Sequence, residues 1–439
     1  MIEKLKAQFE GLVDLVQEKG RSTYLVKEGQ ELLMVDQVER NGELYVPPEL
    51  AQIPWLMPRA KEVLRYYRND NDKQLYDDLF AYFKANSDLP LEEHYHLLVI
   101  WAFHTYLLEA ARYSPYIWFY ADAECGKTRT GKAMSYVGFR GIHVESLTEA
   151  HLIRWATYYR ATMFLDVVNI MKKAKDERSL DLLLQRFERD LKVTRVLRPE
   201  LGPFKDMEMF EVFGATVIAT NESVDETLRS RAIQINIQAS NRQFDEDLTA
   251  QGTLPLKERL VAFRARHLGI TLPDVPKPAP RRLGDILKPL YQVVDLVDKE
   301  RIPVFQELVR KLQAARTLEK SETLEGQIVR AVLTLKDKLT YVNGNPVLSV
   351  KIIAGVVNRD KSEREQLREV IIGRRLTALG FRRTSTREGY AGIVWDEEYN
   401  ERLRVKYGAE KSSGDSGTSS QPSEDYENGI SLVGDESIL

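Results

Sequence analysis

The chain has 439 residues, of which 43% are hydrophobic and 29% are charged, and its formal net charge at pH 7 is −3. This composition is ordinary for a globular protein, and the length allows two or three domains with a sizeable core. No run of about 18 uncharged apolar residues is present, so we expect no membrane span and no membrane partner. One cysteine, Cys125, and six histidines exclude a disulfide framework and any evident zinc site, and they favour a cytoplasmic location.

The first part of the chain predicts two regions. Residues 1–58 are expected to form a small N-terminal α+β unit, in which Asn41-Gly42 is a strong signal for a two-residue hairpin turn. Residues 59–112 predict a helical scaffold. Its stretch Leu91–Ala111 is apolar on nearly every helical face, which indicates a buried helix.

Residues 113–240 alternate between strand and helix patterns, which is typical of a parallel sheet covered by helices. The expected strands are Tyr116–Tyr120, Ala161–Val167, Val193–Leu197, Ala215–Thr220 and Ala232–Ile237, and the first of them are separated by helices at Lys127–Val137, Thr148–Tyr159 and Arg178–Asp190. Residues 241–340 then predict a helical lid and connector. The fold class is therefore α/β.

A phosphate-binding loop lies between the first strand and the first helix of this region. Residues 121–128 read Ala-Asp-Ala-Glu-Cys-Gly-Lys-Thr, the A/G-x-x-x-x-G-K-T pattern. In this context backbone N–H groups face the phosphates, Lys127 adds a positive charge, and the Thr128 hydroxyl can ligate Mg²⁺. The predicted nucleotide contacts are Ala121, Asp122, Ala123, Glu124, Cys125, Gly126, Lys127, Thr128 and Arg129.

Polar residues at later strand ends complete the predicted site. Asp166 ends the apolar strand Thr162–Leu165 and could hold Mg²⁺, while an ordinary strand-terminal Asp is the alternative. Asn221 ends the next buried strand, where it could orient the attacking water. Arg231, with Arg229 in reserve, follows ten residues later, where it could reach the γ-phosphate of a neighbouring subunit.

With these elements in this order, Ser114–Val294 resembles the AAA+ ATPases, in particular the helicase-like ATPases of phage, plasmid and mobile-element replication modules. The resemblance implies ATP and Mg²⁺ as cofactors and a homo-oligomeric ring, such as a hexamer, with ATP between subunits. The roles it implies are Walker A for Ala121–Thr128, Walker B for Met163–Asp166, sensor 1 for Asn221, arginine finger for Arg231 and sensor 2 for Arg282. Lys127, Asp166, Asn221 and Arg231 are then the catalytic residues, and Thr128 and Asp166 are the metal ligands.

One departure from this family leaves hydrolysis open. Val167 follows Asp166, where AAA+ enzymes carry the glutamate that polarises water, and losing a general base costs a factor of about 10²–10⁴. Glu145, Glu177 or a partner protein could supply the carboxylate. The alternatives are a non-hydrolysing nucleotide switch, such as a helicase loader or adaptor, and a P-loop phosphotransferase.

The C-terminal part carries the local basic charge. Residues 345–405 predict helices followed by a β-hairpin, the pattern of a winged helix, and Lys351–Arg387 holds ten basic and four acidic residues. The predicted DNA-binding residues are Arg374, Arg375, Arg382, Arg383 and Arg387. A solvated charged face and a protein-contacting winged helix remain alternatives, and replication proteins are expected partners. Residues 411–439 predict a disordered acidic tail.

A second DNA contact is predicted inside the sheet region. The insertion Leu197–Met209 contains Phe204 and Lys205, an aromatic and a basic side chain of the kind that a pore loop uses to hold DNA.

Overall fold

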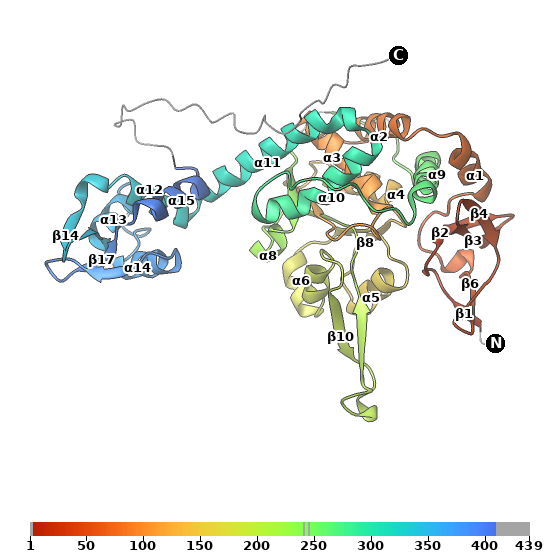
Figure 1. The fold of residues 1–439 in the computed structure, drawn as a ribbon, viewed down its shortest axis with the longest axis horizontal. Helices are drawn as coiled ribbons and strands as arrows, with labels where there is room; N and C mark the ends of the chain where they lie inside the picture. Colours follow the sequence, from red (N-terminus) through yellow and green to blue (C-terminus); the bar gives the residue numbers. More distant parts are fainter. Residues whose placement is uncertain (1–2, 240–241, 245, 410–439) are drawn as a thin grey trace, which may run out of the picture. The chain divides into compact units, whose positions relative to one another are not determined.

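The computed structural model describes residues 3–239, 242–244 and 246–409 of the chain (Figure 1). Its contacts divide the chain into two compact units, Met1–Gln313 and Ala314–Leu439, each with its own hydrophobic core. The divisions expected at residues 58 and 112 therefore fall inside the first unit. The expected tail, 411–439, lies outside the described residues. None of the described helices is both long and apolar enough to cross a bilayer.

The first unit begins with six short strands rather than an α+β mixture. The strands are β1 (Glu3–Leu5), β2 (Leu12–Glu18), β3 (Arg21–Glu28), β4 (Glu31–Val35), β5 (Val38–Arg40) and β6 (Glu43–Val46), arranged as sheets β2-β3-β4 and β1-β6-β5. The hairpin at Asn41-Gly42 is confirmed, with φ of 54° and 72° at the two turn residues. A fully buried ion pair of 2.7 Å between Asp14 and Arg140 ties these strands to the rest of the unit.

Helices then form the predicted scaffold. They are α1 (Ala60–Asn69), α2 (Asp72–Asn86) and α3 (Glu92–Thr105), joined later in the chain by α9 (Ala250–His267), α10 (Arg281–Val297) and α11 (Ile302–Glu322). Residues 94–105 of α3 are all buried, which confirms the prediction for this apolar stretch. A helix that is apolar all round belongs in a core because it has no face that favours water.

The central layer is a five-stranded parallel sheet with helices packed against it. Its order is β13-β7-β12-β9-β8, from β7 (Tyr116–Tyr120), β8 (Ile142–Val144), β9 (Met163–Asp166), β12 (Thr216–Thr220) and β13 (Ala232–Asn236). The connecting helices are α4 (Lys127–Val137), α5 (Glu149–Thr157), α6 (Ile170–Asp176), α7 (Leu180–Gln185) and α8 (Glu226–Arg229). Helix α4 lies along β7, β8, β9 and β12, and α2 and α9 pack over it. The predicted parallel sheet is thereby confirmed.

The prediction that Val193–Leu197 joins this sheet is wrong. That segment forms β10 (Lys192–Val196), which pairs antiparallel with β11 (Met207–Glu211) in a separate two-stranded ribbon. Only Val193 of β10 is buried, so the segment lacks the continuous apolar character of a central parallel strand. The short strand β8 takes the remaining position instead, beside β9.

The second unit has its own small core. It contains α12 (Leu324–Leu333), β14 (Thr340–Val342), β15 (Asn345–Ser349), α13 (Val350–Val357), α14 (Glu369–Ala378), β16 (Arg383–Ser385), β17 (Ala391–Val394) and α15 (Glu397–Tyr407). The strands form an antiparallel sheet in the order β14-β15-β17-β16. The hairpin predicted from Phe381–Thr386 and Gly392–Trp395 is confirmed as β16–β17, with a shorter first strand and a second strand shifted by one residue. Assignment of this unit as a winged helix stays a prediction.

Candidate nucleotide-binding site

The loop between β7 and α4 has the backbone shape that close approach to an anion requires. β7 ends at Tyr120 and α4 begins at Lys127. Glu124 and Gly126 both have left-handed backbone, with φ of 62° and 83°. The loop 121–126 therefore curls back on itself. Gly126 precedes the first residue of α4. The N–H groups at the start of a helix have no partner within the helix, so they are available to bind an anion.

The side chain of Lys127 folds back over this loop. Its ammonium group donates hydrogen bonds to the backbone carbonyl oxygens of Ala121, at 2.8 Å, and of Asp122. Cys125 is partly exposed, and its sulfur lies 3.5 Å from the carbonyl oxygen of Ala123. The positive charge is therefore held at the loop that would enclose the phosphates.

Asp166 lies beside the start of α4, although strand β12 lies between β7 and β9 in the sheet. The pKa of its carboxyl group is lowered by the His143 imidazole, with the nitrogen 3.6 Å away, and by the nearby Thr128 hydroxyl. The carboxylate is thus ionised at neutral pH and lies close to Thr128. Oxygen ligands of this kind are what Mg²⁺ prefers, so the pair fits the predicted metal site.

His143 belongs to the site, and sequence reasoning missed it. It pairs with Phe164 across strands β8 and β9, and its ring stacks on the Phe164 ring with centroids 4.8 Å apart. The only signal in the sequence was a histidine two residues before Glu145 in a short β-branched stretch. Without the pairing of β8 with β9, that signal does not point to Asp166.

Close packing of α4 on β9 brings Thr128 to Asp166. A Cβ atom at Gly131 would overlap the Phe164 ring, so this helix can approach the strand only because residue 131 has no side chain. The tight helix–strand contact and the closeness of the two predicted metal ligands share this cause.

Strand β12 lies between the loop strand and the Asp166 strand. Its Ala219 is in register with Asp166 on one side, and its Thr220 with Tyr120 on the other. The exposed Asn221 follows at the same edge of the sheet. The structure therefore brings Lys127, Thr128, Asp166 and Asn221 to one edge.

Val167 is only 2% exposed and belongs to the core, so the residue after Asp166 offers no carboxylate. Glu145 follows β8 on the far side of Asp166, has an 80% exposed side chain and lies 3.8 Å from His143. Glu177 caps the C-terminal end of α6. Glu222, which sequence reasoning did not consider, accepts a hydrogen bond of 3.0 Å from the backbone N–H of Asn169.

Arg231 and Arg282 lie at the opposite edge of the sheet. The N–H of Tyr116, at the start of β7, donates to the carbonyl oxygen of Arg231. The guanidinium groups of Arg231 and Arg282 lie 5.9 and 5.6 Å from the centroid of the Phe187 ring, and Phe187 accepts a hydrogen bond from Ser114, which precedes β7. Arg282 was expected to contact the nucleotide as the sensor 2 residue. The structure places it beside Arg231 instead, because α10 begins next to Phe187.

Arg229, the reserve candidate, has a different position. It ends α8 and donates to the Ser223 hydroxyl at 3.0 Å, just beyond Asn221.

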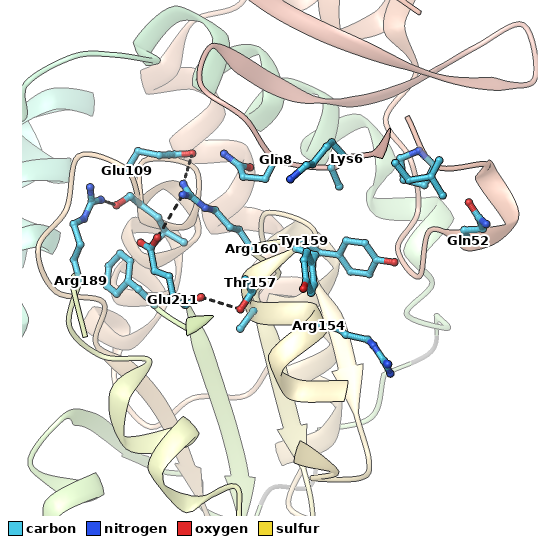
Figure 2. Close-up of a pocket in the computed structure, with 17 residues that line it drawn as sticks. Lys6, Gln8, Gln52, Glu109, Arg154, Thr157, Tyr159, Arg160, Arg189 and Glu211 are labelled. Atoms are coloured by element: carbon cyan, nitrogen blue, oxygen red, sulfur yellow. Dashed lines mark hydrogen bonds and ion pairs between the residues drawn. The ribbon is translucent and has the colours of Figure 1, made fainter. Parts of the chain in front are cut away.

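A cavity of about 740 Å³ lies at the sheet edge away from the loop (Figure 2). Arg160, just before β9, points into it and forms long ion pairs with Glu109, at 3.8 Å, and Glu211, at 4.0 Å (Figure 2). Among the described residues that line it, none belongs to the phosphate-binding loop. This cavity is therefore separate from the candidate nucleotide site.

The ribbon β10–β11 projects from the first unit, as Figure 1 shows. At its tip, Phe204 is 99% exposed, and Leu197 and Leu201 are also exposed. Met209, within β11, is exposed as well. Lys205 is exposed beside Phe204. An aromatic residue so fully in water has no role in this chain's own core, which favours contact with a partner.

The second unit gathers the five predicted DNA-binding arginines on α14 and the β16–β17 hairpin. All five are exposed: Arg374, Arg375, Arg382, Arg383 and Arg387. Arg375 forms an ion pair of 3.0 Å with Glu325, and the Arg383 guanidinium lies against Gly373 of α14. We call these five exposed arginines the arginine surface, and Arg375 within it is already partly neutralised.

No protein-family model matches the sequence, and no curated protein is similar to it. Among solved structures, the chain is similar to an X-ray structure of the JCV helicase bound to an inhibitor, with 14% sequence identity and a TM-score of 0.26. The match covers 57% of this chain and 72% of the JCV helicase chain. At this TM-score the likeness carries no argument about function.

Proposed function

We propose that this chain is an AAA+-type ATPase that binds ATP and Mg²⁺ and acts on DNA as a helicase-like protein of replication or mobile-element maintenance. The observation that carries the proposal is the meeting of Lys127, Thr128, Asp166 and Asn221 at one sheet edge, with the Thr128 hydroxyl close to the Asp166 carboxylate. This combination fits a nucleoside triphosphate: helix N–H groups and an ammonium for phosphates, and two oxygen ligands for a metal.

Each residue has a part in this scheme. The loop 121–126 and Lys127 bind the β- and γ-phosphates, while Thr128 and Asp166 hold Mg²⁺. When bound, Mg²⁺ neutralises charge that develops on the phosphate oxygens. Asn221 orients the attacking water, because it follows the strand between the loop and Asp166.

A second subunit completes the site in this proposal. Arg231 lies at the sheet edge opposite its own loop. The two edges are separated by the five residues of β7, each about 3.3 Å long. The Arg231 guanidinium can act on a γ-phosphate only if that phosphate belongs to another copy of the chain. This arrangement supports a homo-oligomeric ring.

Two surfaces would contact DNA. The tip of β10–β11 offers an exposed aromatic and a lysine, and the second unit offers its arginine surface. The order of helix, two strands, two helices and hairpin from α12 to β17 supports a winged helix. Cations on α14 and the hairpin would bind phosphates with little sequence preference.

The buried Val167 favours a second candidate, a nucleotide switch that binds ATP without turning it over, as a loader or adaptor would. The phosphotransferase alternative has less support, because Arg231 and the DNA-directed surfaces have no role in it.

The deciding experiment measures ATP binding and ATP turnover by the full chain, with and without single-stranded and duplex DNA, beside K127A. We expect turnover that rises with DNA and disappears in K127A. Tight binding without turnover would establish the switch. Turnover only when a small-molecule acceptor is added would establish the phosphotransferase.

A further inference from the structure

The residue that activates water in the proposed ATPase reaction is missing from its expected position. A general base must lie near both the metal-binding carboxylate and the γ-phosphate, which occupies the space between the loop after β7 and Asp166. The sheet order places only β12 between these two strands. A carboxylate that follows β12 is therefore on the correct side of Asp166.

Glu222 is the second residue after β12. Its backbone N–H donates to the Thr220 hydroxyl at 3.0 Å, which fixes the turn after the strand. Its carboxylate accepts the Asn169 N–H at 3.0 Å, so it lies beside the segment that leaves β9. The side chain is partly buried between the ends of β12 and β9. It is therefore close to Val167, the position at which a carboxylate was expected.

The other two candidate carboxylates are less well placed. Glu145 follows β8, on the side of β9 away from the phosphate-binding loop, and its side chain is largely exposed. Glu177 lies at the far end of the seven-residue helix α6, roughly 12 Å along the helix from Asn169 at 1.5 Å per residue. Neither lies between the loop and Asp166.

We propose that Glu222 is the general base of this site, in place of the missing glutamate at residue 167. The inference rests on the ATP hydrolysis proposed above. One proton of the attacking water passes to the Glu222 carboxylate as the water oxygen forms a bond to the γ-phosphorus. The bond from that phosphorus to the β–γ bridging oxygen breaks, and its electron pair stays on ADP. The products are ADP and inorganic phosphate, and Glu222 then returns its proton to solvent.

The test compares E222Q, E222A and E145Q in the full chain. A glutamine at 222 can still accept the Asn169 hydrogen bond but cannot take a proton, whereas alanine loses both functions. We expect E222Q and E222A to bind ATP with affinities within about threefold of wild type and to lose turnover by about 10²–10⁴-fold. E145Q, which changes the exposed carboxylate beside His143, serves as the control and keeps turnover within about threefold.

A second readout follows the bound nucleotide. After incubation with ATP and Mg²⁺ and rapid removal of free nucleotide, wild type and E145Q should retain mainly ADP, whereas E222Q should retain ATP.

The possible outcomes distinguish a failure of the Glu222 proposal from a failure of the ATPase proposal. Wild-type turnover together with unimpaired E222Q would remove Glu222 as the base and leave the ATPase proposal intact. Loss in E222A with full activity in E222Q would also overturn it, because only the hydrogen bond to Asn169 would then matter. Absence of turnover in wild type, with ATP bound, would remove hydrolysis itself and with it any base.

Discussion

The guanidinium groups of Arg231 and Arg282 share one aromatic ring, that of Phe187, from which they lie 5.9 and 5.6 Å away. Burial lowers the pKa of Arg231, and the neighbouring charge of Arg282 lowers it further. Two cations held this close repel each other and gain from a shared anion. In the proposed ring, that anion is the γ-phosphate of the adjacent subunit.

The first prediction follows from this pair. R231A should bind ATP normally but lose turnover by about 10³-fold, because an arginine finger acts only in the transition state. R282A should lose turnover to a smaller extent, also with normal ATP binding. Steady-state turnover and equilibrium ATP binding measure the two effects.

Subunit mixing tests whether Arg231 acts across an interface. K127A retains Arg231, and R231A retains the loop, so a mixture should show turnover that neither variant has alone. An equally inactive mixture would show that Arg231 does not act on the site of a neighbouring subunit. R65A provides a matched control, since Arg65 forms an exposed ion pair with Glu62 on α1.

The second prediction concerns the tip of β10–β11. F204A and K205A should each abolish the stimulation of turnover by DNA while leaving basal turnover unchanged, because both side chains are exposed and far from the core. E200A, an exposed acid in the same tip, should keep full stimulation. Intact stimulation in both F204A and K205A would rule out a DNA-contacting tip.

The third prediction concerns the arginine surface of the second unit. Combined R374A, R382A and R387A should weaken binding to all DNA sequences alike. The slope of log affinity against log salt should become shallower by about 0.9 for each DNA phosphate that the variant no longer neutralises. Arg383 is left in place because it packs against Gly373. An unchanged salt slope would favour a protein partner for this surface.

Arg375 gives an internal comparison on the same surface. Its ion pair with Glu325 already offsets its charge, so R375A should change DNA affinity less than R374A does.

The sequence predicted those parts of the fold that depend only on residues close together in the chain. The aromatic strand β7 and the helix α4 were predicted with the residues that the structure has, because a buried strand, a Gly-Lys-Thr turn and a Pro-free stretch follow one another. The burial of α3 was predictable for the same reason, since its sequence is apolar on every face.

The missed features depend on contacts between distant segments. β8 has three residues, too few for a periodic pattern, so its pairing with β9 and the contact from His143 to Asp166 could not be anticipated. β10 has strand-forming residues, but its exposed face excludes it from the sheet centre. The position of Arg282 depends on where α10 begins against Phe187, which no local motif specifies.

The fourth prediction tests the packing of α4 on β9. G131A should lower the free energy of unfolding by about 1–3 kcal/mol, because the added methyl group overlaps the buried Phe164 ring. It should also weaken ATP binding, since the helix that carries Thr128 must move away from Asp166. Denaturant unfolding and ATP titration measure the two effects. G355A, in α13 where nothing crowds the Cβ position, should instead be neutral or stabilising.

The fifth prediction concerns three buried histidines of α3. Burial lowers the pKa of His104 to about 3 and that of His94 to about 4, and it also lowers the pKa of His96. The folded chain therefore keeps these rings neutral at pH values where the unfolded chain, with a histidine pKa of about 6.5, binds protons. Because the unfolded state then binds more protons, the free energy of unfolding should fall as the pH drops below about 6.5.

The histidine at position 104 should account for about 1.4 kcal/mol of this loss per pH unit between pH 6 and 4. H104Q, whose amide can replace the 3.1 Å hydrogen bond to Ser114, should flatten the dependence by that amount. Denaturant titrations of wild type and H104Q at pH 7, 6, 5 and 4.5 measure the difference. Parallel curves for the two proteins would mean that His104 is protonated in the folded chain, which its complete burial makes unfavourable.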